Sequence, residues 1–525
     1  MANAVKQSAQ KTSMLKVAVF LLAVYANINY LLFMLNPAHA SNLPFFVITA
    51  LADTIAVFIF LSTWGTALFF EVSRSRYYRE LDDLRARGQH LAAQRVAVLV
   101  PVAGEDIQLI RHTLTNAMRM RGDLHIYVLD DGRRTETEML CRGLGLEYVT
   151  RVGNAFYKAG NLNNGLRRVK EDFVVVVDAD FTLRDDFVER TLPLFADPQV
   201  AIVQTPQVYY NEDTLFSRGA KRLQTLFYSY LQPGKHLLDS AFCVGTNVVY
   251  RMSALAEIGG IAQIAHSEDV FTSLALAERG YRTAYIDEPL AIGLAPSTLI
   301  AFFNQQFRWA RGGFTMLRHN PLFNERLRLD QRFQFFFSNT FYLSGVAVLI
   351  YLVSPLIAVL AGVKPVSDQY YSEWLTKYAL FWGVNFLFYL LLVKRNWWAT
   401  LTLGMFSFVP YLAALAAVAF RSEARWKPTN ARSAGLITTL LSPLIVYLAC
   451  VLITGYLLFT GQLPPTVGFV QYYVWLALDV ALILPFIVTA YFARSKLILP
   501  RFDEWQTDTE APGTSGIREM QQASA

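Results

Sequence analysis

Long apolar runs alternate with one extended polar region along this chain. Crossing the hydrocarbon region of a bilayer as a helix takes roughly 20 apolar residues. Runs of that length lie at about 14–35, 44–70, 337–363, 374–393, 434–460 and 468–493. A shorter run at 397–419 contains Pro410 and precedes the arginine-rich segment 421–432. Because a crossing at 397–419 would carry those arginines to the outside, we expect six spans and an interfacial helix at 397–419.

The region between about 90 and 335 has a different pattern. Short β-branched runs end in Asp, Pro or Gly and are separated by charged, helix-like stretches. These runs are VAVLVPV (96–102), HIYVLDD (125–131) and FVVVVDAD (173–180). Near-continuous Val and Ile runs of this length are typical of strands buried on both faces of a parallel sheet. The alternation of strands and helices predicts a Rossmann-like α/β domain whose ligands bind beyond the carboxyl ends of the strands.

The positions of Lys and Arg predict how the chain is oriented. The connections 36–43 and 461–467 are uncharged, whereas basic residues flank the other ends of their spans. Because cytoplasmic flanks are enriched in Lys and Arg, we expect the α/β domain to be cytoplasmic. We interpret the first run as a retained anchor, with a cleaved signal peptide as the alternative. The predicted parts are a transmembrane hairpin (1–75), the α/β domain (76–335), further transmembrane helices (336–495) and a disordered tail (496–525).

Composition agrees with a membrane protein. Of the 525 residues, 54% are hydrophobic and only 17% are charged, which is unusual for a soluble protein of this size. The net charge of +6 is too small to indicate nucleic acid binding, so no nucleic acid partner is expected. The three cysteines, Cys141, Cys243 and Cys450, are too widely spaced to indicate a disulfide framework or a zinc site.

Acidic residues follow two of the predicted strands. Asp130 and Asp131 end the second, and Asp178 and Asp180 end the third. Because alternate residues on an extended segment point the same way, Asp178 and Asp180 can share a hard divalent cation with the phosphates of a substrate. This arrangement suits a nucleotide diphosphate with Mg²⁺ or Mn²⁺. Asp-Gly is also a common turn sequence, so a simple turn remains the alternative at the second strand.

Two later motifs carry further candidate chemistry. Glu268 and Asp269 precede a helix-like stretch, where they are either first-turn acids favoured by the helix dipole or a base for a sugar hydroxyl. Gln305, Arg308 and Trp309 lie just ahead of the later apolar runs. An arginine offers a planar fork of donors for phosphate, and an indole face can stack on a sugar ring. The alternative is an arginine and tryptophan that only anchor the chain at the membrane surface.

Taken in order, these motifs resemble one family. The set Asp-Asp (130–131), Asp-x-Asp (178–180), Ser-Glu-Asp (267–269) and Gln-x-x-Arg-Trp (305–309) is similar to that of the processive membrane glycosyltransferases of family 2. That family includes the cellulose, curdlan, mixed-linkage glucan, chitin and hyaluronan synthases. Shorter strings such as FCVGTNVVYR (242–251) agree, and the resemblance is strongest to the cellulose synthase branch. It implies a GT-A domain inserted between transmembrane helices.

The resemblance also implies roles for individual residues. Asp178 and Asp180 would bind Mg²⁺ or Mn²⁺, and Asp269, with Glu268 beside it, would be the catalytic base. The donor nucleotide would contact Glu105, Asp130, Asp131, Lys158, Gln305, Arg308 and Thr429. The acceptor and the channel mouth would contact Trp309, Phe242, Cys243 and Gly245.

The function implied is inverting polymerisation of a β-glucan from UDP-glucose, with export of the polymer through a bacterial inner membrane. Its partners would be the UDP-sugar, the growing polysaccharide, the lipid bilayer and, in some systems, periplasmic export or regulatory subunits. The alternatives are a chitin, hyaluronan or alginate type of synthase, a non-processive transferase acting on a lipid carrier, and an inert membrane subunit.

Two departures from the cellulose synthase pattern leave the identity of the polymer undetermined. Phe181 replaces the His that usually follows the Asp-x-Asp motif of cellulose synthases, and RWKPTNAR (425–432), within the gating-loop-like segment 421–433, keeps only Thr429 of the usual loop pattern. No domain follows the last predicted span, so control by cyclic-di-GMP would need a partner.

Overall fold

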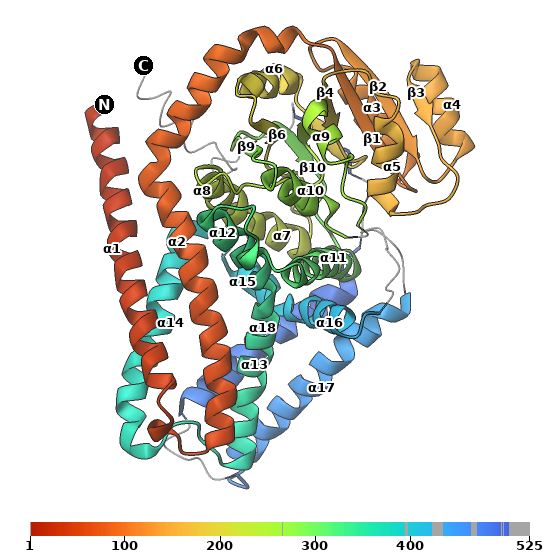
Figure 1. The fold of residues 1–525 in the computed structure, drawn as a ribbon. Helices are drawn as coiled ribbons and strands as arrows, with labels where there is room; N and C mark the ends of the chain where they lie inside the picture. The colour runs from red at the N-terminus through yellow and green to blue at the C-terminus, as the bar shows by residue number, and fades with distance from the viewer. Residues whose placement is uncertain are drawn as a thin grey trace.

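The computed structural model describes residues 2–264, 266–393, 397–422, 434–463, 470–494, 496 and 498–502. An α/β domain lies at one end of a bundle of long helices (Figure 1). The helix α2 (Leu43–Gly88) belongs to both parts, because it runs antiparallel to α1 (Ala2–Met34) in the bundle and continues alongside the α/β domain. The boundary predicted at residue 75 therefore falls inside one continuous helix.

Within the described residues, the domain is built on a seven-stranded sheet in the order β3-β2-β1-β4-β8-β6-β9. The strands β1, β2, β3 and β4 pair in parallel, as predicted, and every residue of β1 is buried. The strand β8 is antiparallel to both neighbours, which the sequence did not predict. The fold class is the expected α/β type. The strands are β1 (Val96–Val102), β2 (Leu124–Asp130), β3 (Glu147–Val149), β4 (Phe173–Val176), β6 (Val200–Gln204), β8 (Val248–Arg251) and β9 (Arg282–Tyr285).

A smaller sheet begins where β4 ends. In the described part of the chain it has three strands, β5 (Phe181–Leu183), β10 (Ala291–Gly293) and β7 (Val208–Tyr209), in that order. The chain therefore passes from one sheet to the other across the segment 177–180, which fixes this segment at both ends. The helices of the domain are α3 (Ile107–Ala117), α4 (Thr135–Leu144), α5 (Tyr157–Leu166), α6 (Phe187–Thr191), α7 (Leu215–Leu226), α8 (Gln232–His236), α9 (Met252–Glu257), α10 (Glu268–Ala277) and α11 (Leu299–Arg318).

Seven helical segments in the described residues are long and apolar enough to cross a membrane, which fits a multi-pass membrane protein. One of them is 397–419, the predicted interfacial segment, which forms two helices that meet at Ser407. The second of these, α16, packs along α11, and both run across the direction of α1 and α2 (Figure 1). The helices after α11 are α12 (Leu329–Thr340), α13 (Ser344–Ala361), α14 (Tyr371–Val393), α15 (Trp397–Phe406), α16 (Phe408–Ala419), α17 (Ala434–Phe459) and α18 (Val470–Phe492).

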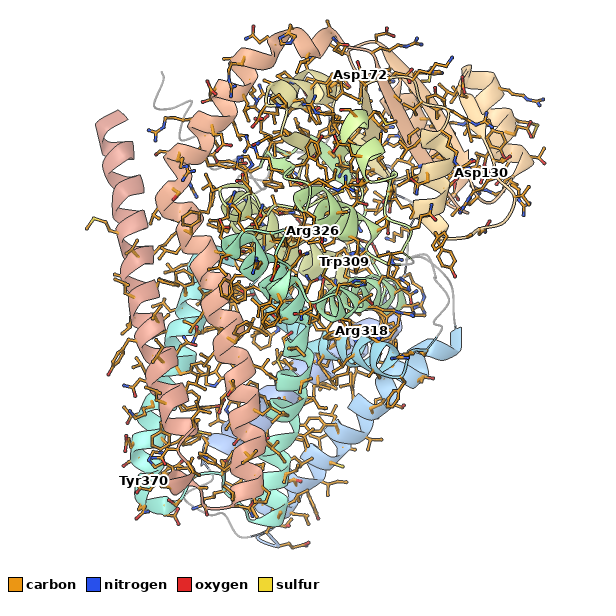
Figure 2. All side chains as sticks on the ribbon, viewed as in Figure 1. Asp130, Asp172, Trp309, Arg318, Arg326 and Tyr370 are labelled. Atoms are coloured by element: carbon orange, nitrogen blue, oxygen red, sulfur yellow. The ribbon has the colours of Figure 1, made fainter. Side chains whose placement is uncertain are left out.

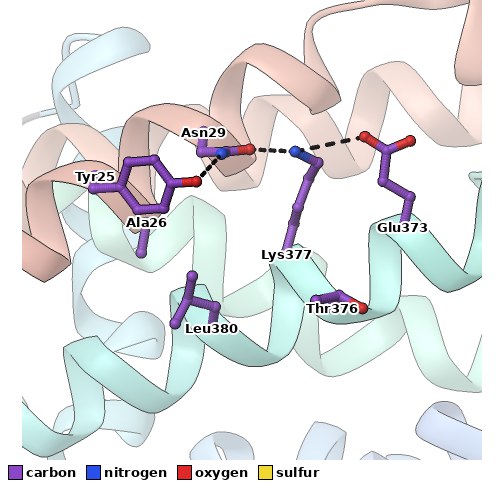
Figure 3. Close-up of a pocket in the computed structure, with 7 residues that line it drawn as sticks. All are labelled: Tyr25, Ala26, Asn29, Glu373, Thr376, Lys377 and Leu380. Carbon is purple, nitrogen blue, oxygen red and sulfur yellow. Dashed lines mark hydrogen bonds and ion pairs between the residues drawn. The ribbon is translucent and has the colours of Figure 1, made fainter.

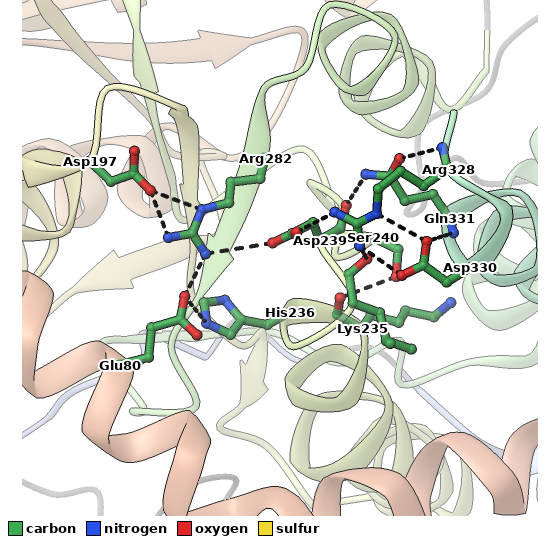
Figure 4. Close-up of polar contacts among 11 residues, drawn as sticks. Glu80, Asp197, Lys235, His236, Asp239, Ser240, Arg282, Arg328, Asp330 and Gln331 are labelled. Carbon is green, nitrogen blue, oxygen red and sulfur yellow. Dashed lines mark hydrogen bonds and ion pairs between the residues drawn. The ribbon is translucent and has the colours of Figure 1, made fainter. Parts of the chain in front are cut away.

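Ion pairs join the domain to the helices that lead into the bundle (Figure 4). Arg282 of β9 donates to Glu80 of α2 at 2.5 Å and to Asp197 at 2.9 Å. Arg328, the residue before α12, donates to Asp239 of the domain at 2.7 Å. Because these contacts connect α2 and the start of α12 to the same domain, they hold the sheet in a fixed position over the bundle.

Candidate active site

Backbone hydrogen bonds to other elements position the segment that carries the two aspartates after β4. The N–H of Asp178 donates to the hydroxyl of Thr246, 2.9 Å away, on the loop that leads into β8. The carbonyl of Ala179 accepts a hydrogen bond from Thr113 of α3 at 2.7 Å. The antiparallel strand β8 therefore supports the segment that carries Asp178 and Asp180, although the two β-elements lie some 70 residues apart in the chain.

Lys158, in the first turn of α5, contacts this segment directly. Its ammonium group donates to the Asp178 carboxylate and, at 2.8 Å, to the carbonyl of Gly245. Burial lowers the pKa of Lys158, but the carboxylates of Asp178, Glu268 and Asp269 outweigh it and raise the pKa above its usual value. The lysine is therefore a firm positive charge among these acids.

Asp180 has an environment that suits a cation. Burial, and then the nearby carboxylates of Asp178 and Glu105, raise its pKa to about 7, against the effect of Lys158. Among the described residues no group of three or more His, Cys, Asp and Glu side chains could hold a metal alone. Because Mg²⁺ is usually bound by one or two carboxylates together with substrate phosphates, the pair Asp178 and Asp180 fits such an ion.

Asp269 and Glu268 open α10, after Ser267 in a left-handed conformation (φ 57°). One oxygen of Asp269 accepts from the N–H of Val270 at 2.9 Å. A Cβ on Gly245 would lie 3.1 Å from the other oxygen, so the glycine allows its loop to approach the acid closely. Burial, and then the charge of Glu268, raise the pKa of Asp269 to about 7. A carboxyl with this pKa is suited to accept a proton near neutral pH.

The helix α11 brings Gln305 and Arg308 to the same place. Burial lowers the pKa of the Arg308 guanidinium, and Asp178 and Glu268 oppose that effect, so the arginine lies within electrostatic range of both acids. Gln305 donates to the hydroxyl of Tyr209 at 3.1 Å, while its side-chain oxygen has no hydrogen-bond partner among the described residues. Arg308 thus lies near the acids, and Gln305, one turn earlier on α11, contacts Tyr209.

Trp309 follows Arg308 on α11 and is half-buried. Figure 2 shows it where the α/β domain meets the helices of the bundle. Trp309 is therefore at the boundary between the α/β domain and the membrane helices.

The amino-acid sequence of this region matches two known families. Residues 93–312 match the glycosyltransferase-like family 2, and residues 255–398 match the cellulose synthase family. Residues 93–398 are therefore similar to a family 2 glycosyltransferase domain of the cellulose synthase type. The strand-end acids, the acids of α10 and the Gln305 to Trp309 motif all lie within these matched residues.

Curated relatives are bacterial cellulose synthases. Cellulose synthase 2 of Novacetimonas hansenii is 34% identical over 51% of this chain and 17% of its own length. The cellulose synthase catalytic subunit of Pseudomonas fluorescens is 34% identical over 51% of this chain and 38% of its own length. This chain therefore spans well under half the length of these relatives. A solved mannosyltransferase of Pyrobaculum calidifontis covers 72% of this chain with 18% identity and a TM-score of 0.47.

Asp130, a predicted nucleotide contact, lies at the end of β2. This residue has no exposed surface, so it cannot contact a nucleotide in this conformation. Its carboxylate accepts from the N–H groups of Gly132 (2.8 Å) and Arg134 (2.9 Å) and from the hydroxyl of Tyr148 (3.0 Å). Asp130 thus holds the turn after β2, which is the alternative that the Asp-Gly sequence left open.

Asp131 and Glu105, both predicted nucleotide contacts, lie at the carboxyl ends of β2 and β1. Both oxygens of Asp131 accept from Arg151, at 2.6 and 2.7 Å, and its side chain is 9% exposed. Glu105 accepts from the N–H groups of Ala103 and Gly104 and lies near Asp180. Glu105 therefore belongs to the acidic cluster, whereas Asp131 belongs to an ion pair beside it.

Two of the predicted channel-mouth residues are buried in this structure. Cys243 has no exposed surface and contacts the hydroxyl of Tyr250 at 2.9 Å, and burial raises the pKa of its thiol. Phe242 is buried against Phe227 and Phe335. Both side chains therefore pack inside the domain and support the loop. The third predicted residue of this loop, Gly245, is the one that lies close to an acid, Asp269. Thr429 lies outside the described residues.

His266 is a site residue that sequence reasoning missed. It is 8% exposed, and neither ring nitrogen has a hydrogen-bond partner among the described residues. Burial, and then the charges of Arg311 and Arg308, lower its pKa to about 4, so the ring is neutral near pH 7. Its place directly before the Ser-Glu-Asp motif was a signal, but a single histidine in sequence does not reveal which arginines it will lie beside.

Proposed function

We propose that this protein is a processive, inverting glycosyltransferase that forms a β-glucan from UDP-glucose and moves it across the membrane. One observation carries the proposal. Acids from the end of β4 and the start of α10 surround Lys158 and face Arg308, and the next residue on that helix, Trp309, lies at the top of the membrane bundle. Arg308, the residue proposed to contact the donor, is thus followed directly by Trp309, the residue proposed to hold the acceptor.

The donor would bind with its diphosphate against the strand end. Asp178 and Asp180 would hold Mg²⁺ or Mn²⁺, which would neutralise charge on the diphosphate when bound. Lys158 and Arg308 supply further positive charge, and a guanidinium can bind phosphate oxygens through two parallel hydrogen bonds. The negative charge that grows on the leaving UDP is therefore offset by groups that are already in place.

Asp269 would act as the base. It accepts the proton of the acceptor hydroxyl as that oxygen bonds to the anomeric carbon, and the bond from that carbon to the diphosphate oxygen breaks. Attack from the face opposite the leaving group converts an α-linked donor into a β-linked product. The pKa of Asp269, about 7, leaves a substantial fraction of this carboxyl group ionised at neutral pH.

Trp309 would hold the terminal sugar of the growing chain, which keeps the product bound between additions. Buried polar groups in the bundle support a route onward from there. Asp53 of α2 accepts from the hydroxyls of Tyr30 (3.0 Å) and Tyr351 (2.8 Å), and Asp479 of α18 accepts from Tyr447. Ionisable residues within membrane helices are costly and often mark a substrate path.

The proposed setting is a bacterial inner membrane with the catalytic domain in the cytoplasm. The positive residues that flank the helices on that side support this orientation. The proposed partners are the UDP-sugar, the growing polysaccharide, the bilayer and export or regulatory subunits. A chitin, hyaluronan or alginate type of polymer is the alternative product, because no described contact fixes the donor sugar.

The decisive experiment supplies purified full-length protein with Mg²⁺ and a panel of radiolabelled nucleotide sugars. Product size is measured by gel filtration, and linkage by digestion with linkage-specific hydrolases. We expect a long polymer from UDP-glucose that a β-glucanase degrades. A labelled monosaccharide that extracts only into organic solvent would reject processivity and indicate a lipid-carrier transferase. Asp185→Asn, an exposed aspartate of the same domain, is the matched control for site variants.

A further inference from the structure

A groove with a mostly apolar lining and a few polar groups opens between α1 and α14 (Figure 3). Its volume is about 300 Å³, and it is lined by Tyr25, Ala26 and Asn29 from α1 and by Glu373, Thr376, Lys377 and Leu380 from α14. Both helices are candidate membrane spans, and Tyr25 is 58% exposed on the outer surface of the bundle. The groove therefore faces the lipid, where a charged side chain is costly unless a polar partner accompanies it.

The charges in the groove form a chain of contacts. The ammonium of Lys377 contacts the side-chain oxygen of Asn29 and lies 3.5 Å from the Glu373 carboxylate. The amide of Asn29 donates to the hydroxyl of Tyr25 at 2.9 Å. The Lys377 side chain is 24% exposed and that of Glu373 is 54% exposed, so both charges remain accessible to a ligand.

The depth of these groups matches the edge of a bilayer. A backbone bridge between Ala40 and Val366 joins the α1–α2 and α13–α14 connections, so both lie at the same end of the bundle. α14 begins at Tyr371, which places Glu373 near the aqueous end. Lys377 is four residues further on, about 6 Å deeper. The negative group is thus the outer one and the positive group the inner one.

We propose that this groove binds the headgroup of a zwitterionic phospholipid that carries a primary ammonium. In such a lipid the phosphate is attached to the glycerol and lies deeper, whereas the ammonium is outermost. Lys377 then binds the phosphate and Glu373 the ammonium, while the acyl chains run along Tyr25 and Leu380. Because the pair has no net charge, an anionic headgroup gains nothing over a zwitterionic one. A quaternary headgroup has no N–H to donate to the carboxylate.

The test is native mass spectrometry of the full-length protein, released from detergent with phosphatidylethanolamine, phosphatidylcholine or phosphatidylglycerol. We expect phosphatidylethanolamine to be retained about three- to five-fold more than the others, the size expected for a partly exposed ion pair. Glu373→Lys combined with Lys377→Glu keeps the ion pair and the net charge but reverses its polarity, and should abolish the preference. Lys364→Met, which breaks an ion pair with Asp368 outside the groove, is the matched control and should keep it.

Three outcomes would overturn the proposal. Equal retention of the three lipids by the wild-type protein would show ordinary annular lipid. A preference that survives the reversed pair would show that the charges only join the two helices. Co-purification of a stoichiometric protein subunit, lost in Lys377→Met, would assign the groove to a partner helix. The proposal does not depend on the glycosyltransferase reaction, so each can fail alone.

Discussion

Two pairs of acids, one at the end of β2 and one after β4, differ in what surrounds them. After β2, Asp130 accepts from two backbone N–H groups and a tyrosine, and Asp131 accepts twice from Arg151. After β4, the carboxylate of Asp180 faces the other acids Asp178 and Glu105, with Lys158 nearby. Asp269 on α10 likewise faces Glu268, and one of its oxygens accepts from the N–H of Val270.

The difference separates structural from chemical acids. A carboxylate whose oxygens are filled by nearby N–H and O–H groups has little capacity left for a ligand, and it stabilises the turn that fills it. Crowded carboxylates repel one another, so a cation or a proton is favoured between them. The acids after β2 therefore stabilise their turn, whereas the acids between β4 and α10 keep the capacity to accept a cation or a proton.

The largest expected effect is at Asp269. Asp269→Asn removes the proton acceptor and should lower the rate of polymer formation by about 10²–10⁴-fold, the usual contribution of a positioned base. UDP affinity, measured by calorimetry, should stay near wild type because Asp178 and Asp180 remain. Asp185→Asn should retain full activity. A wild-type rate in Asp269→Asn would remove the base assignment.

The next effect is on cation-dependent donor binding. Asp180→Asn should weaken the Mg²⁺-dependent part of UDP affinity by about 10–100-fold, since a metal ligand is lost. Calorimetric titration of UDP with and without Mg²⁺ measures that part directly. Unchanged UDP affinity with unchanged Mg²⁺ dependence would show that the metal does not bind at the end of β4.

The rate should also depend on pH. Because the pKa of Asp269 is raised to about 7, the base is mostly protonated at pH 6, and turnover should fall about ten-fold per pH unit below that value. The same raised pKa also makes the stability of the folded state depend on pH. The folded state holds this proton more tightly than the unfolded state, so this contribution is fully present at low pH and is lost as pH rises through about 7. A flat rate profile between pH 5.5 and about 8 would contradict the assignment.

The smallest expected effect on chemistry is at the β2 turn. Asp130→Ala leaves buried donors of Gly132, Arg134 and Tyr148 without an acceptor, which should cost about 1–3 kcal/mol of stability. Thermal unfolding in detergent checks this. Turnover per folded molecule should stay within about two-fold of wild type, since the turn holds no reacting group. A selective loss of UDP binding with unchanged stability would restore Asp130 as a nucleotide contact.

Much of this could be predicted from the sequence because the signals are local. A run of some 20 apolar residues is kept out of water only as a buried or membrane helix. Near-continuous Val and Ile runs specify buried strands. The order of the acidic motifs, and of Gln305, Arg308 and Trp309 after them, placed the site at the strand ends beside the membrane.

Only the tertiary structure decided what each of those residues contacts. Asp130 and Asp269 look alike in sequence, but one is enclosed by its own turn and the other faces a glycine some 25 residues earlier. Cys243 is buried against Tyr250 of the antiparallel strand β8, and Lys377 contacts Asn29 across nearly 350 residues of chain. Hydrogen-bond partners are set by packing between distant segments, and local pattern carries no record of that packing.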